Sequence, residues 1–152
     1  MKKAVSVLLL AAALFVLVGW SPQQSVAKVG LGHVTSIASS KDLVVDKSGK
    51  VTPPVAQVDT TIAAVAFDKG GRVIGLTIDT AQTKVNFDKD LNVTSDLIAA
   101  NKTKVELADG YGMRKASSIK KEWFEQISSF EQWMIGKTVA EIKSLKVKQR
   151  DA

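Results

Sequence analysis

The chain has 152 residues, of which 45% are hydrophobic and 24% charged, and 21 basic against 15 acidic side chains give a net charge of +6. This length favours a single domain. The absence of cysteine excludes disulfides, thiolate metal sites and cysteine nucleophiles, and the single histidine, His33, excludes sites that need two imidazoles. We therefore do not expect one of the common hydrolases or metalloenzymes.

The amino-terminal 27 residues have the form of a secretory signal peptide. Two lysines at positions 2 and 3 precede Ala4–Trp20, which is uncharged and apolar except for Ser6. As a helix, this stretch would reach only about 25 Å, less than the roughly 30 Å of a bilayer core. Small residues in Ser25-Val26-Ala27 then fit a signal-peptidase site. The sequence predicts cleavage near Ala27, and the alternative is an uncleaved amino-terminal anchor.

The end of this segment also has the pattern of a bacterial lipobox that lacks its cysteine. Leu17-Val18-Gly19 supplies the preceding positions, but Trp20 stands where the lipid-bearing cysteine would be. A lipid thioether needs a thiol, so we expect a secreted protein without a stable membrane anchor after cleavage.

The remaining residues, 28–152, are expected to form one domain. Residues 28–57 read as a partly irregular segment with a possible first strand at 33–38 and a loop at Pro53-Pro54. Residues 58–67 are rich in Thr, Val, Ile and Ala, and residues 72–78 place Ile74, Leu76 and Ile78 on one face; Asp68-Lys69-Gly70-Gly71 lies between them. Because glycine adopts positive φ without strain, this pattern predicts a β-hairpin.

A second turn is expected at 88–90, between strand candidates at 84–87 and 91–94, and residues 102–107 could add a strand or an extended edge segment. Asp88–Asn92 also resembles the start of a calcium loop. However, Val93 and Ala99 stand where that loop needs glycine and a bidentate glutamate, so we expect a turn and no metal site.

Helical periodicity begins after a glycine-bearing loop at 109–113. From about Ser117 the apolar residues are spaced three or four apart, at Ile119, Trp123, Ile127, Phe130 and Met134. Gly136 is expected to end this helix, and Thr138 with Glu141 to cap a short final one through Leu145. The predicted fold is α+β, an antiparallel sheet of about four to five strands packed by one long helix of the C-terminal half plus the short final helix.

Several short motifs resemble a family of small exported, often lipoprotein-type, proteins of Gram-positive anaerobes. They lie at 80–88, 104–107, 111–113, 116–119, 121–123 and 136–139. That family is similar in layout to exported FMN-binding domains, which have a strand hairpin with an Asp-Lys-Gly turn, a loop and a helix. The resemblance implies FMN as a candidate cofactor.

Flavin-linked relatives of this kind carry a Ser-Gly-Ala-Thr motif whose threonine is esterified to FMN. The nearest segment here is Lys115-Ala116-Ser117-Ser118, which lacks the glycine and has serine for threonine. Covalent attachment is therefore not expected, and the two serine hydroxyls are expected to cap the following helix instead.

A non-covalent site remains physically reasonable in the same region. Tyr111 and Trp123, together with Trp133, could stack on a flat ring, and Arg114 and Lys115 could meet a phosphate. Free N–H groups would be available at the helix start near Ser117 and Ser118. The alternative for Trp123 is an ordinary core residue.

The sequence thus favours an exported, non-catalytic ligand-binding or electron-transfer accessory domain of the FMN-binding kind, meeting a small flat ligand or redox partner at the cell envelope. The alternative is an envelope-associated interaction or structural protein without a small-molecule site. No paired carboxylates or nucleophile–base pair points to an enzyme. The lysines are spread along the chain, which does not favour nucleic-acid binding.

Overall fold

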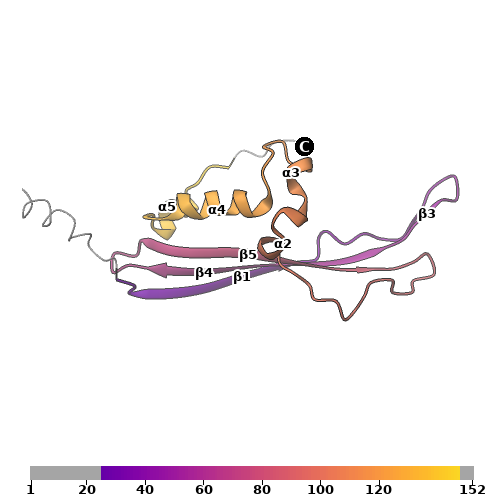
Figure 1. The fold of residues 1–152 in the computed structure, drawn as a ribbon, viewed down its shortest axis with the longest axis horizontal. Coiled ribbons are helices and arrows are strands. Elements are labelled where there is room, and N and C mark those ends of the chain that lie inside the picture. The colour runs from indigo at the N-terminus through magenta and orange to yellow at the C-terminus, as the bar shows by residue number, and fades with distance from the viewer. Residues whose placement is uncertain (1–24, 148–152) are drawn as a thin grey trace, which may run out of the picture.

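The computed structural model describes residues 25–147 (Figure 1). Its main sheet is antiparallel, with strand order β1-β4-β5, formed by β1 (Lys28–Ser36), β4 (Val55–Phe67) and β5 (Val73–Asn86). A separate two-stranded sheet pairs β2 (Val44–Val45) with β3 (Val51–Thr52). The sheet therefore has three strands plus this small ribbon, and not the four to five that the sequence predicted.

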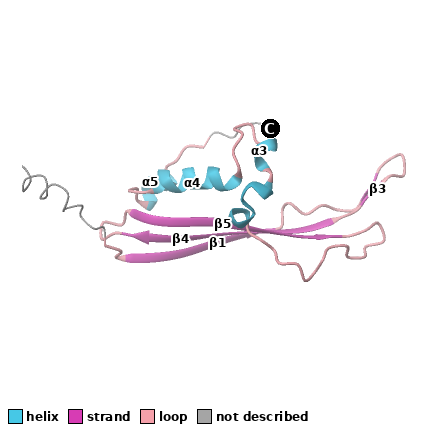
Figure 2. Ribbon diagram, viewed as in Figure 1, coloured by secondary structure: helices cyan, strands magenta, loops and turns pink. Residues whose placement is uncertain are grey.

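The helical half of the chain lies on one side of the main sheet, along β5 (Figure 2). In chain order it contains α2 (Lys104–Leu107), the 3₁₀ helix η1 (Ala108–Tyr111), α3 (Met113–Ala116), α4 (Trp123–Met134) and α5 (Val139–Lys143). The α+β class and the antiparallel sheet are confirmed. No helix within residues 25–147 is both long and apolar enough to cross a membrane.

The central hairpin, β4–β5, forms where the sequence predicted it but is longer at its open end. At its turn, the Asp68 carboxylate accepts hydrogen bonds from the amides of Gly70 and Arg72, both at 2.8 Å. Gly71 takes φ +74°, the left-handed conformation that glycine adopts without a Cβ clash. The first strand also forms, but as Lys28–Ser36 and not at 33–38.

The two faces of the sheet differ in exposure. On β4, the side chains on the helix side, such as Gln57 and Val65, are buried or half-buried, whereas most on the opposite face, such as Ile62 and Ala64, are exposed. Among the described residues, the buried apolar side chains are Val73 and Met134. The core therefore lies between the start of β5 and the end of α4.

Three predictions about local structure were wrong. Residues 104–107 form α2 and not a strand, because Thr103 and Glu106 make a capping box in which each side chain accepts the other's amide. Residues 91–94 do not form a strand of the sheet: they meet the end of β5 through an isolated bridge between Phe87 and Val93 and through the Thr94 amide, which donates to the Asn86 carbonyl at 2.9 Å. The loop expected at 109–113 is occupied by η1 and the start of α3.

The long helix begins six residues later than predicted, at Trp123. Lys120 takes φ +53°, which interrupts helical geometry, and Ile119 stays 53% exposed. The helix ends at Met134 before Gly136, which takes φ +79°, and the Thr138–Glu141 capping box begins α5, as predicted. Apart from Ser25–Ala27, the predicted signal peptide lies outside the described residues.

Candidate functional site: a lysine pocket beside α2

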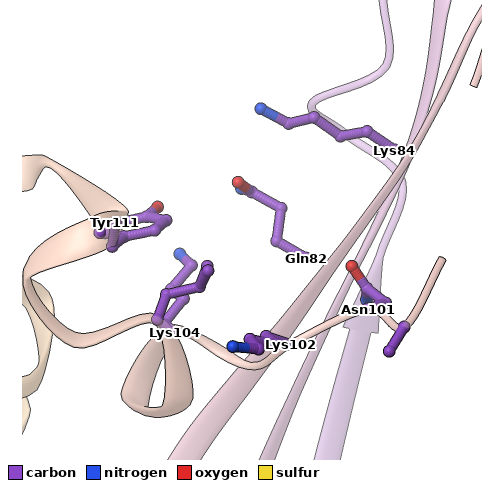
Figure 3. Close-up of a pocket in the computed structure, with 9 residues that line it drawn as sticks. Gln82, Lys84, Asn101, Lys102, Lys104 and Tyr111 are labelled. Atoms are coloured by element: carbon purple, nitrogen blue, oxygen red, sulfur yellow. The ribbon is translucent and has the colours of Figure 1, made fainter.

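An open pocket of about 530 Å³ lies between the distal half of β5 and the α2–η1 segment (Figure 3). Strand β5 contributes Gln82 and Lys84, two residues apart and therefore on one face. The α2 side contributes Asn101, Lys102, Lys104 and Tyr111. In Figure 3 the side chains of Gln82 and Lys84 face Tyr111 across the open space.

The pocket is strongly cationic. Lys84, Lys102 and Lys104 line it, and no carboxylate is among its lining residues. The Lys104 ammonium lies 5.0 Å from the centroid of the Tyr111 ring and 5.6 Å from that of Trp123, which are cation–π distances. These two rings therefore hold Lys104 in place, and the Tyr111 ring gives the pocket an aromatic wall beside a positive charge.

The acidic side chain of Asp59 lies near the pocket, because Asp59 of β4 pairs directly with Gln82 of β5 in the sheet. Burial raises the pKa of Asp59, but hydrogen bonds from the side chains of Gln57, Gln82 and Ser39 and the charge of Lys104 outweigh it, so that the pKa is lowered overall. Asp59 thus stays ionised and offsets about one of the three positive charges. The pocket keeps a positive excess.

The six predicted site residues are only partly brought together. Tyr111 lines the pocket, and Trp123 supports it through Lys104. Arg114 is engaged by two carboxylates, at 3.1 Å from Asp109 and 2.8 Å from Glu125, and the Glu125 hydrogen bond raises its pKa. Lys115, Ser117 and Ser118 are not among the lining residues. Trp133 stacks on Phe130 at the other end of α4.

The expected capping role of Ser117 and Ser118 was wrong. Ser117 follows α3 as its C-cap, and the N-cap of α4 is Glu122. The Glu122 side chain is almost fully buried, and its carboxylate accepts hydrogen bonds from the amides of Met113 at 2.8 Å and Arg114 at 3.0 Å. The residue thus joins the starts of α3 and α4, and the amides at the start of α3 are already bonded.

Sequence analysis missed the basic residues that define the pocket. Lys84 began a strand candidate at 84–87, but Gln82 lay between the predicted strands. Only the unbroken strand β5 (Val73–Asn86) puts the two side chains on one face. Lys102 and Lys104 were assigned to a strand candidate, and only the turn of α2 brings Lys104 to the aromatic rings. Residues 25–147 contain no cluster of three or more potential metal ligands.

Comparison with known proteins gives one informative relative. Over 104 residues the chain is 33% identical to a chlorophenol reductase of Desulfitobacterium hafniense. The match covers 61% of this chain but only 32% of that protein, so the chain spans about a third of its relative's length. No family model matches the sequence, and no solved structure matches it.

Proposed function

We propose that the protein is an exported, non-catalytic binding domain that holds a flat organic anion in the lysine pocket, with FMN as the leading candidate. The observation that carries the proposal is the convergence of Lys84, Lys102 and Lys104 with Tyr111 around one cavity. Its volume of about 530 Å³ is in the range of small-molecule sites.

The chemistry of the lining favours an anion with an aromatic part. Lysine ammonium groups attract phosphate, carboxylate or phenolate oxygens, and the amides of Gln82 and Asn101 can donate further hydrogen bonds. The Tyr111 ring offers a flat apolar surface at the same place. FMN combines a phosphate with a flat ring system, so these residues fit it. A bound flavin would supply redox chemistry, while the chain's residues would bind and orient it.

The relative's name points to the same class of molecule. A chlorophenol reductase acts on chlorinated phenols, which are flat and become anions on ionisation, and it carries out a reduction. We infer that the matched third of that protein would then be its binding or electron-transfer portion. The similarity that supports this role covers 32% of the relative.

Titration of the purified protein with FMN, followed by flavin fluorescence, tests the proposal directly. A polychlorinated phenol that is ionised at neutral pH serves as a second probe. Lys84→Gln is expected to weaken binding about tenfold, since a charge-assisted hydrogen bond contributes about 1.5–3 kcal/mol and exposure reduces that value. Lys69→Gln is the matched control, because Lys69 lies in the distant 68–71 turn.

Two results would count against the proposal. Failure of both probes to bind at about 1 mM would leave no anion site and favour the alternative, an envelope interaction protein without a ligand. Equal loss of affinity in Lys84→Gln and Lys69→Gln would mean that binding depends on overall charge and not on this pocket.

Export is the second part of the proposal, and it rests on the amino-terminal sequence. Amino-terminal sequencing of the protein released by its host is expected to begin near Lys28. Trp20→Cys should complete the lipobox and move the protein to the membrane fraction, where each buried CH₂ contributes about 0.8 kcal/mol. A wild-type start at Met1 with membrane retention would contradict the secreted assignment.

A further inference from the structure

The face of the main sheet that points away from the helices is unusually apolar for an exposed surface. Along β1 it presents Val29 and Leu31, which are 72% and 78% exposed, and on β4 it presents Ile62, which is 47% exposed. Next to these side chains lie the small residues Ala64 and Gly75. This surface is called the open face below.

The open face is also depleted of charge, although the chain as a whole carries +6. Within β1, β4 and β5 its titratable side chains are His33 and Asp79, which are separated only by Ile62 in one row across the three strands. Asp79 accepts hydrogen bonds from the amides of Thr80 and Val105 through Oδ1, and Oδ2 accepts none among the described residues. Charge depletion at an apolar centre is typical of homodimer interfaces.

We propose that the open face binds the same face of a second copy of this chain. A two-fold axis parallel to the strands and above β4 places β1 of each copy over β5 of the other. Because His33, Ile62 and Asp79 lie in one row, this axis puts His33 of each copy over Asp79 of the other copy. The Asp79 Oδ2 is then available to accept a hydrogen bond from the His33 ring N–H. The two titratable groups of the face thus pair with each other, twice, around an Ile62–Ile62 centre.

The shape of the face fits the same arrangement. Bulky side chains stand on β1, whereas a shallow apolar hollow of about 320 Å³ lies over Ala64–Ala66 and Gly75–Thr77. In register, Val29 shares a row with Gly75, and Leu31 shares a row with Thr77. The two-fold axis therefore sets each large β1 side chain over a small β5 residue of the second copy.

The area is adequate for association. Nine paired residues of β1 at about 3.4 Å and three strands at about 4.8 Å give roughly 440 Å² in projection, which the longer β4–β5 pair extends to about 570 Å². Side chains that project from the face add to this projected area. The area available for burial therefore approaches the roughly 800 Å² that each partner buries in a standard interface. Two such sheets can pack face to face at about 10 Å.

Sedimentation of the purified full-chain product tests the proposal. The average mass is expected to rise toward twice the monomer mass between about 1 μM and about 1 mM protein. Leu31→Glu should raise the dissociation constant at least about tenfold, because each copy places a carboxylate in the apolar contact. Val34→Glu is the matched control, since Val34 is 70% exposed on the same strand but on the opposite face.

The pairing of His33 with Asp79 has its own test. His33→Lys should retain association, whereas His33→Glu should weaken it by facing the Asp79 carboxylate. The chain has no cysteine, so in Ile62→Cys a bifunctional maleimide that spans about 10 Å should link two copies of the chain, and in Val34→Cys it should not. Position 62 of each copy faces position 62 of the other across the about 10 Å between the sheets, whereas position 34 lies on the opposite face of the sheet.

A monomer throughout this concentration range, with no selective cross-link, would overturn the proposal and leave the open face to another macromolecule. Equal effects of Leu31→Glu and Val34→Glu, or of His33→Glu and His33→Lys, would overturn the proposed register. If Leu31→Glu fails to fold by circular dichroism, the two single-cysteine variants decide the question.

Discussion

Leu91 occupies a turn position that two equivalent turns of this protein give to glycine. Turns at Asp46, Asp68 and Asp88 share one design, in which the aspartate carboxylate accepts the amides two and four residues later. The third residue after each aspartate takes positive φ: Gly49 at +82°, Gly71 at +74° and Leu91 at +66°. A side chain in this conformation costs about 1–2 kcal/mol.

Leu91→Gly should therefore stabilise the protein. Relief of about 1–2 kcal/mol is partly offset by about 0.5–1 kcal/mol of extra chain entropy in the unfolded state, which leaves a net gain of about 0.5–1 kcal/mol. Little burial is lost, because Leu91 is 60% exposed. Urea unfolding monitored by circular dichroism measures the gain.

Lys89→Gly in the same turn is the matched control. Lys89 does not have positive φ, so the glycine should add unfolded-state entropy and destabilise by about 0.5–1 kcal/mol, and the exposed Lys89–Asp90 ion pair that is also lost adds little to this. Hydrogen exchange at the Leu91 amide, which donates to the Asp88 carbonyl at 3.2 Å, reports the turn itself. If Leu91→Gly destabilised the protein as much as Lys89→Gly, the strain argument would be refuted.

Two further predictions concern α2 and α4. Ala108, the C-cap of α2, has φ +47° and ψ −124°, so Ala108→Gly should raise the unfolding free energy by about 1 kcal/mol in the same urea assay, and a loss would contradict the assigned backbone. The Glu122 amide and the side chains of Lys121 and Arg114 lower the pKa of Glu125 to about 2. Because the folded pKa lies below the unfolded value, this stabilisation is present above about pH 4.5 and lost as the pH falls toward 2. Glu125→Gln should flatten the pH dependence of urea unfolding in that window, and an unchanged slope would show that other groups cause it.

The parts of the fold that sequence analysis predicted correctly are those specified locally. The β4–β5 hairpin follows from two segments rich in β-branched residues around the Asp68-Lys69-Gly70-Gly71 turn, and the end of α4 follows from Gly136. These signals act within a few residues, so tertiary context did not override them.

The errors come from patterns that two structures can share. The Lys-Val-Glu-Leu of α2 alternates like a strand, and the readable signal against it was the capping box of Thr103 and Glu106. Ile119 continues the apolar spacing of α4 backwards, although Lys120 breaks the helix between them. The lysine pocket was missed because it depends on contact between β5 and α2, which no local pattern encodes.

Glu122 is the clearest case of a residue whose role only the tertiary structure reveals, and it yields a final prediction. Its carboxylate receives the amides of Met113 and Arg114 at 3% exposure, while its own amide donates to Glu125 at 2.8 Å. Glu122→Gln replaces one acceptor oxygen by a donor and removes the charge, so it should cost about 1.5–3 kcal/mol of stability. Since α3 follows directly on η1, FMN affinity should fall as Tyr111 shifts.

Glu106→Gln is the control, because Glu106 accepts one amide at an exposed site and its substitution should cost well under half as much stability. If both variants lost the same small amount in urea unfolding, Glu122 would not join these two helix starts as argued.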